Sequence, residues 1–122
     1  MGIVALDHVQ LAMPAGQEDK AREFYQDILG IPERVKPANL AARGGCWFEA
    51  GHVRVHLGVD PEFKPAGKAH PAFLVDDLSA LRKRLEAAVC RVVEDEPWEG
   101  YERCYTYDPF GNRIELMQPV EP

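Results

Sequence analysis

Long apolar runs are missing from this 122-residue chain. No stretch approaches the roughly 20 apolar residues that a membrane-spanning helix needs. The first residues also lack a charged segment followed by a long apolar one, so we expect no export signal and predict a cytoplasmic protein. Cysteine is scarce as well, with three residues, at positions 46, 90 and 104, and no CxxC pair. This argues against a disulfide framework or a zinc knuckle and favours three structural thiols in a reducing compartment.

An excess of positive charge is also absent. The chain has 14 Lys and Arg against 20 Asp and Glu, a net charge of −6, and its basic residues are scattered. No basic surface is therefore expected for a nucleic-acid backbone. Hydrophobic residues make up 46% of the sequence, which is enough for a sizeable core. We predict a single domain that covers residues 1–122.

The first half of the chain contains segments with the apolar spacing of strands and one segment with that of a helix. Apolar residues recur at every second position in residues 3–13, which predicts a strand, and follow a helical stripe in residues 17–29. Three shorter strands are predicted at 33–36, 45–50 and 52–59, with a turn at Gly51. A first βαβββ module is therefore predicted at about residues 1–60.

The same pattern restarts after a polar, proline-containing linker at residues 60–68. A strand is predicted at 70–75, and Asp76 and Asp77 offer an N-cap for the helix that follows. Further strands are predicted at 91–94, 102–107 and 113–118. The fold class is α+β, with two tandem βαβββ modules, the second at about 68–122, forming a mixed sheet.

An internal duplication explains this pattern and brings four metal-competent residues into equivalent places. Val-Arg-Val-His-Leu near the end of the first half aligns with Asn-Arg-Ile-Glu-Leu near the end of the second, which pairs His56 with Glu115. His8 and His70 stand on the first strands. An unpartnered polar side chain in an apolar strand costs about 1 to 3 kcal/mol, and a shared metal site supplies the missing partner. We predict a divalent metal bound by His8, His56, His70 and Glu115, with zinc, nickel, cobalt, iron or manganese as the ion.

Four sequence motifs resemble the vicinal oxygen chelate superfamily, which includes glyoxalase I, fosfomycin- and bleomycin-resistance proteins and extradiol dioxygenases. They cover nearly the whole chain and are Leu-Asp-His-Val-Gln-Leu (6–11), Ala-Arg-Glu-Phe-Tyr-Gln-Asp-Ile-Leu-Gly (21–30), His-Pro-Ala-Phe-Leu-Val (70–75) and Asp-Pro-Phe-Gly-Asn-Arg-Ile-Glu-Leu (108–116). The resemblance implies that the paired modules form a cup-shaped glyoxalase-like sheet. It also implies a divalent metal that chelates two neighbouring oxygens of a substrate.

The resemblance also implies roles for individual residues. His8, His70 and Glu115 match the family's ligand positions, while His56 stands where typical bacterial glyoxalase I has a glutamate. A glutathione-thioacetal isomerase is therefore disfavoured, although Glu115 can still move a proton as the catalytic base. The family's two-module members are commonly homodimers that share the metal site, so we expect such a dimer.

Several aromatic and arginine side chains are candidates for the lining of the site. We predict that Trp47, Arg103 and Tyr105 contact the substrate, because arginine and aromatic rings orient anionic or planar molecules. The alternative is that Trp47 covers the open face of the sheet or the seam of a dimer. Arg54 and Arg113 each stand two residues before a proposed ligand and face the cup or its rim, where they could pair with Glu115.

Three functions remain open at this stage. We predict a metal-dependent glyoxalase-like lyase or isomerase that chelates a small oxygen-rich metabolite. An Fe(II) dioxygenase is the alternative enzyme, since two His and one Glu form a facial triad, but extradiol dioxygenases usually need a four-module chain. A bleomycin-resistance-like dimer that binds a ligand without catalysis is the third, and its relatives generally lack the metal ligands. A fosfomycin-type thiol transferase would need a Lys and Ser cluster that residues 94–103 do not provide.

Overall fold

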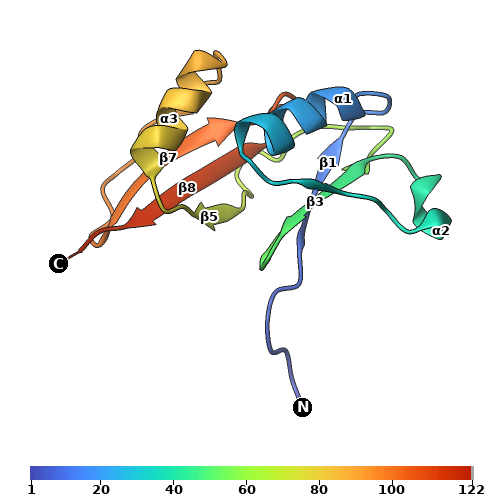
Figure 1. Ribbon diagram of the computed structural model, residues 1–122, viewed down its shortest axis with the longest axis horizontal. Coiled ribbons are helices and arrows are strands. Elements are labelled where there is room, and N and C mark those ends of the chain that lie inside the picture. Colours follow the sequence, from blue (N-terminus) through green and yellow to red (C-terminus); the bar gives the residue numbers. More distant parts are fainter. Residues whose placement is uncertain (122) are drawn as a thin grey trace. The chain divides into compact units, whose positions relative to one another are not determined.

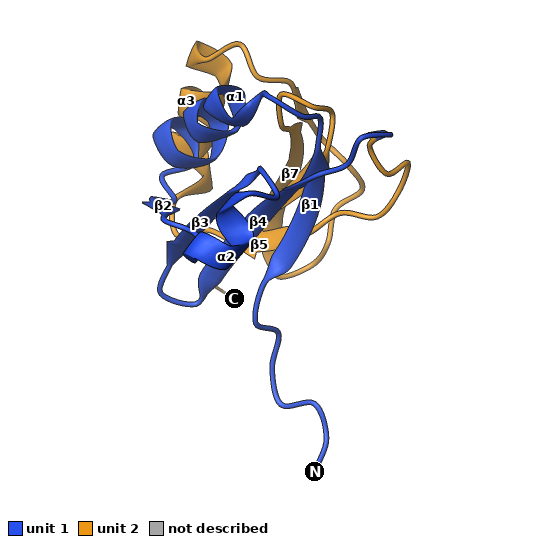
Figure 2. Ribbon diagram, turned by 90° about the vertical axis from the view of Figure 1, so that its right-hand side faces the viewer, with its two compact units in different colours: residues 1–64 blue, residues 65–122 orange. Residues whose placement is uncertain are grey.

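The computed structural model describes residues 1–121, which form two compact units that divide between Lys64 and Pro65 (Figure 2). Each unit contains one four-stranded mixed sheet and a helix that packs on it. The predicted α+β class with two βαβββ halves is therefore confirmed. None of the helices in residues 1–121 is long and apolar enough to cross a membrane.

The first unit follows the predicted order, with one short helix added (Figure 1). Its strands run in the order β1-β4-β3-β2, with β1 parallel to β4 and the other neighbours antiparallel. The elements are β1 (Val9–Met13), α1 (Glu18–Ala21) with its π-helical continuation η1 (Arg22–Ile28), β2 (Glu33–Arg34), α2 (Ala38–Ala41), β3 (Cys46–Ala50) and β4 (Val53–Val59).

The second unit repeats this arrangement. Its strand order is β5-β8-β7-β6, again with the first strand parallel to the last. The register shows the duplication directly, because Gln10 lies opposite His56 in the first unit and Ala72 lies opposite Glu115 in the second. The elements are β5 (Ala72–Leu74), α3 (Leu78–Ala87), β6 (Val92–Val93), β7 (Tyr101–Tyr107) and β8 (Arg113–Pro119).

Each sheet buries one face and presents polar side chains on the other. In β4, Val55 and Leu57 are buried in the core, and the alternation of the strand places Arg54 and His56 on the opposite face. β8 follows the same rule, with Ile114 buried on the core side. The face away from each core is therefore where functional side chains can gather.

The first strand is shorter than the sequence predicts. It begins at Val9 rather than at residue 3, and residues 1–8 continue as an extended arm (Figure 1). The register explains this, because Val9 already pairs with Val55 and the β3–β4 turn follows only three residues further back. The apolar side chains of the arm are almost fully exposed, at 100% for Ile3, 97% for Val4 and 84% for Leu6.

The short helix α2, which the sequence did not predict, is followed by a loop that requires glycine. Gly44 and Gly45 both adopt a positive φ, of 76° and 78°. A Cβ atom on Gly45 would lie 2.0 Å from the backbone oxygen of Leu57, so only glycine lets β3 approach β4 here. This loop fixes where α2 lies beside the open face of the first sheet.

Candidate functional site

In the second unit, His70 and Glu115 face each other. The Nε2 atom of His70 lies 2.9 Å from Oε1 of Glu115, whose side chain is 6% exposed. The other ring nitrogen, Nδ1, lies 2.9 Å from the carbonyl oxygen of Lys68. A carbonyl oxygen only accepts, so Nδ1 carries a proton, and in a neutral ring Nε2 holds a lone pair. Two acceptors then face each other, and a proton or a cation is needed between them.

Arg103 holds the second oxygen of the same carboxylate. Its Nη1 donates to Oε2 of Glu115 over 3.2 Å and to the hydroxyl of Tyr105 over 3.1 Å, and its Nη2 donates to the carbonyl oxygen of Glu96. The bond to Tyr105, supported by the charge of Glu115, raises the pKa of Arg103 above its ordinary value. Glu115 is thus fixed in position by a permanent cation.

Two arginine nitrogens near this pair have no partner within residues 1–121. They are the buried Nε atoms of Arg103 and Arg113. The guanidinium of Arg113 lies 5.1 Å from the centre of the Tyr105 ring, as a cation–π contact rather than the pairing with Glu115 that the sequence left open. Buried N–H groups usually find an acceptor, so these two donors are exceptions within residues 1–121.

In the first unit, Nδ1 of His8 faces an oxygen acceptor, as Nδ1 of His70 does in the second. Nδ1 of His8 lies 2.9 Å from the Asp7 carboxylate, which also accepts a hydrogen bond from Arg54 over 2.6 Å. The hydrogen bond from His8, with Arg54 adding to it, lowers the pKa of Asp7. Since a carboxylate accepts the Nδ1 proton, the Nε2 lone pair of His8 is available to a metal.

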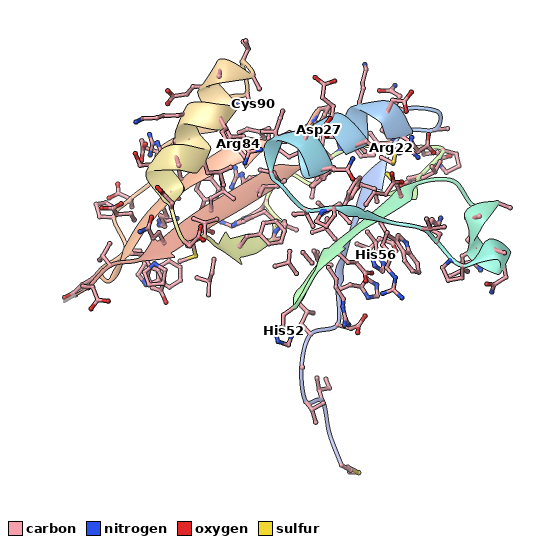
Figure 3. All side chains as sticks on the ribbon, in the orientation of Figure 1. Arg22, Asp27, His52, His56, Arg84 and Cys90 are labelled. Atoms are coloured by element: carbon pink, nitrogen blue, oxygen red, sulfur yellow. The ribbon has the colours of Figure 1, made fainter. Side chains whose placement is uncertain are left out.

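His56, labelled in Figure 3, lies on the open face of the sheet. Its ring is the middle one of a stack of three. The centre of the Trp47 ring lies 4.0 Å from the centre of the His56 ring, and the two planes are nearly parallel. The centre of the His8 ring lies 4.2 Å away, with an angle of 21° between the two planes. Nε2 of His56 is 2.7 Å from Oε2 of Glu49, whose other oxygen accepts a 2.7 Å hydrogen bond from Arg34. The bond from His56 and then that from Arg34 lower the pKa of Glu49.

A cavity of about 550 Å³ opens beside this stack. Trp47, His8 and His56 line it, together with side chains from β2, α2 and the following loop. Sequence reasoning missed Glu49, although alternation along β3 places it on the same face as Trp47. It also missed Lys36 and Arg43. Lys36 is the last residue of the strand predicted at 33–36, Arg43 lies outside the predicted segments, and no motif marks either residue as a binding residue.

The structure thus gathers the predicted site residues into two sets, one in each unit. The first unit brings together Trp47, His8 and His56, and the second brings together His70, Glu115, Arg103 and Tyr105. Within residues 1–121, no three or more His, Cys, Asp or Glu side chains lie close enough to hold one ion.

Comparisons with known proteins place this arrangement in a family. Residues 5–116 match the Glyoxalase/Bleomycin resistance protein/Dioxygenase superfamily. A crystal structure of a glyoxalase family protein from Bacillus anthracis is 42% identical, with a TM-score of 0.93 over 98% of each chain. The fosfomycin resistance protein FosX from Listeria monocytogenes is 18% identical, with a TM-score of 0.77 over 98% of this chain and 96% of that one.

A more distant structure, lactoylglutathione lyase from Agrobacterium tumefaciens, is 24% identical, with a TM-score of 0.64 over 89% of this chain and 90% of its own. Among curated protein sequences, the comparison finds no match. The last two structures share the fold with this chain. The match over residues 5–116 and the 42% identity to the Bacillus anthracis protein go further, and they show that the chain belongs to the glyoxalase/bleomycin resistance protein/dioxygenase superfamily.

Proposed function

We propose that this protein is a metal-dependent enzyme of the glyoxalase type, a lyase or isomerase that acts on a small oxygen-rich metabolite. The divalent metal is held by His8, His70 and Glu115. The observation that carries the proposal is the pairing of His70 with Glu115, in which a nitrogen lone pair and a carboxylate oxygen face each other at 2.9 Å.

The spacing and chemistry of this pair fit a metal ion. Two ligands that are each about 2.1 Å from one ion lie about 3.0 Å apart at the right angle of an octahedral site, and about 3.4 Å apart in the tetrahedral geometry usual for zinc. The 2.9 Å between Nε2 of His70 and Oε1 of Glu115 is close to the octahedral value. Imidazole and carboxylate donors suit zinc, nickel, cobalt, iron or manganese. The Nδ1 atoms of His8 and His70 are both bound to oxygen acceptors, which is the usual support for a metal-bound histidine.

His56, the fourth ligand that the sequence predicts, has a different environment. No hydrogen bond to its Nδ1 is found within residues 1–121, so the ring can carry its proton on Nε2 and donate it to Glu49. The pair then satisfies itself without a metal. We therefore assign His56 to the support of His8, whose ring it contacts face to face, and leave three protein ligands.

The exposed N-terminal arm supports a homodimer. Three apolar side chains of the arm are exposed to water: Ile3, Val4 and Leu6. Burying one such side chain against a partner would contribute about 1.5 to 3 kcal/mol. We propose that the arm packs on a second copy, and that His8 of one subunit joins His70 and Glu115 of the other. One domain per chain and a cytoplasmic location remain part of the same proposal.

The bound metal would supply a Lewis acid that polarises two neighbouring oxygens of the substrate. Glu115 takes up a proton from the adjacent carbon, and Arg103 keeps that carboxylate in position through its second oxygen. Tyr105 is 9% exposed and, through its bond to Arg103, shapes the wall beside Glu115.

Metal content tests the proposal. We expect one divalent ion per chain by elemental analysis of untagged protein, and its loss in His8→Ala and in His70→Ala. The matched control is His52→Ala, since His52 is the remaining histidine and lies exposed at the turn before β4 (Figure 3). His56→Ala decides between three and four ligands, and we expect it to retain the metal.

The identity of the metal then separates the reactions. Nickel or zinc favours isomerisation, whereas iron together with oxygen uptake would favour the dioxygenase. Metal-free protein from a purification without chelators, unable to take up added nickel, zinc or iron, would refute the proposed chemistry. A ligand-binding dimer would then be the better account.

A further inference from the structure

The cavity of the first unit is positively charged, although the chain carries a net charge of −6. Four cationic side chains line it, against two carboxylates, those of Asp7 and Glu49. Both carboxylates are already paired, Glu49 with Arg34 over 2.7 Å and Asp7 with Arg54 over 2.6 Å. The other two cations, Lys36 and Arg43, have no carboxylate partner in the described chain.

Lys36 and Arg43 stand on either side of α2. The ammonium of Lys36 donates one hydrogen bond, over 2.5 Å, to the carbonyl oxygen of Gly44, so two of its three N–H groups remain unused. The guanidinium of Arg43 is exposed and makes no ion pair within residues 1–121. The strict conformation of the loop at Gly44 and Gly45 fixes this end of the cavity.

Part of the remaining wall is aromatic and apolar. Trp47 lines the cavity, with one face of its ring against His56. Leu40 and Val59 also line the cavity. A ligand in this cavity can therefore meet both cationic groups and a flat, apolar surface. Because His8 lies in the same cavity, such a ligand would also lie next to a proposed metal ligand.

From this arrangement we infer that the substrate is an oxyanion: a small molecule whose carboxylate or phosphonate group binds between Lys36 and Arg43 while its planar or apolar body lies along Trp47. The inference rests on the proposed function and gives it a substrate class. Two unpaired cations in a partly enclosed cavity attract an anion and disfavour a further positive charge.

Three probes of similar shape test the inference: benzoate, phenylphosphonate and the neutral benzamide. The protein is dialysed free of metal and carries the substitution Trp98→Phe at an exposed position. Trp47 is then the only tryptophan, and its fluorescence reports binding. We expect at least one of the two anions to bind about tenfold more tightly than benzamide, as a charge-assisted hydrogen bond predicts. The stronger of the two identifies the anionic group.

Substitutions locate the anion. Lys36→Gln and Arg43→Gln should each weaken binding of the preferred anion about tenfold and leave benzamide unchanged. Lys20→Gln is the control, because Lys20 is an exposed cation on α1 outside the cavity lining. Equal binding of all three probes, no saturable quenching by either anion, or full affinity in both cavity variants would overturn the inference.

The test is independent of the metal. If the anion binds as expected but the chain takes up no metal, the oxyanion site stands and the proposed chemistry fails. If metal binds but the probes show no preference for an anion, the substrate class fails and the metal site stands.

Discussion

Replacing Gly45 by alanine should destabilise the fold by an amount that the structure allows us to divide into two parts. The first part is the backbone conformation, since Gly45 has a φ of 78° and an L-residue there costs about 1 to 2 kcal/mol. The second is a steric clash, because the new Cβ would lie 2.0 Å from the backbone oxygen of Leu57. Gly45 immediately precedes Cys46, which pairs with Leu57, so relieving the clash must move β3 away from β4.

The matched control is Gly16→Ala. Gly16 has almost the same φ, 77°, but a Cβ there would meet nothing within 4 Å. The free energy of unfolding of this variant should therefore fall only by the conformational cost of about 1 to 2 kcal/mol. Gly45→Ala adds the loss of at least one ladder hydrogen bond and of packing between the strands, so we expect about 3 to 5 kcal/mol in total.

Urea unfolding followed by circular dichroism measures both values from the midpoint and the slope of the transition. The loss of stability in Gly45→Ala should exceed that in Gly16→Ala by about 2 kcal/mol or more. Equal losses in the two variants would mean that β3 moves without cost, and the reasoning from the clash would be wrong. A loss of 3 to 5 kcal/mol is a large share of the roughly 5 to 15 kcal/mol of a typical domain, so partial unfolding of Gly45→Ala is also an expected result.

Two further predictions concern helix α3 and the cysteine thiols. Asp77→Ala should lower the free energy of unfolding by about 1 kcal/mol, because the Asp77 carboxylate caps α3 by accepting from the backbone N–H of Ala80, while Asp76→Ala should change it little in the same urea assay. Burial raises the pKa of Cys46 to about 11, so near pH 8 only about one thiol in a thousand is ionised there and its modification should quicken as the pH rises towards 11. With a thiol reagent at pH 8, the half-buried Cys90 should react first in the native protein, and labelling of Cys46 at the same rate would contradict the burial.

Most of the fold could be predicted from the sequence because its apolar periodicity is regular. His56 and Glu115 hold equivalent positions in the two halves, and this equivalence follows from the same alternation that predicts their strands. The arm at residues 1–8 could not be predicted, since its apolar alternation is that of a strand and only the register with β4 shows that no partner strand remains. The short helix α2 has no periodic stripe from which it could be identified.

The candidate site was predicted in part, for a related reason. His70 and Glu115 stand out as polar residues in apolar strands, and the structure brings them to 2.9 Å. Glu49 shares its face with Trp47, but a glutamate on a strand that is open on one side is ordinary, so nothing in the sequence marks it. Which ring nitrogen of His70 carries the proton depends on its contact with the carbonyl oxygen of Lys68, and that contact is seen only in the structure.

The two histidines that keep an Nε2 lone pair differ in how they would withstand mutation. His70 relies on the backbone carbonyl of Lys68, and every amino acid at position 68 supplies that oxygen. His8 relies on the side chain of Asp7, which most single substitutions would remove. Genetic drift at position 68 would therefore leave the orientation of the His70 ring intact, whereas drift at position 7 would release His8. The duplicated halves, alike in topology, are unequal in mutational robustness.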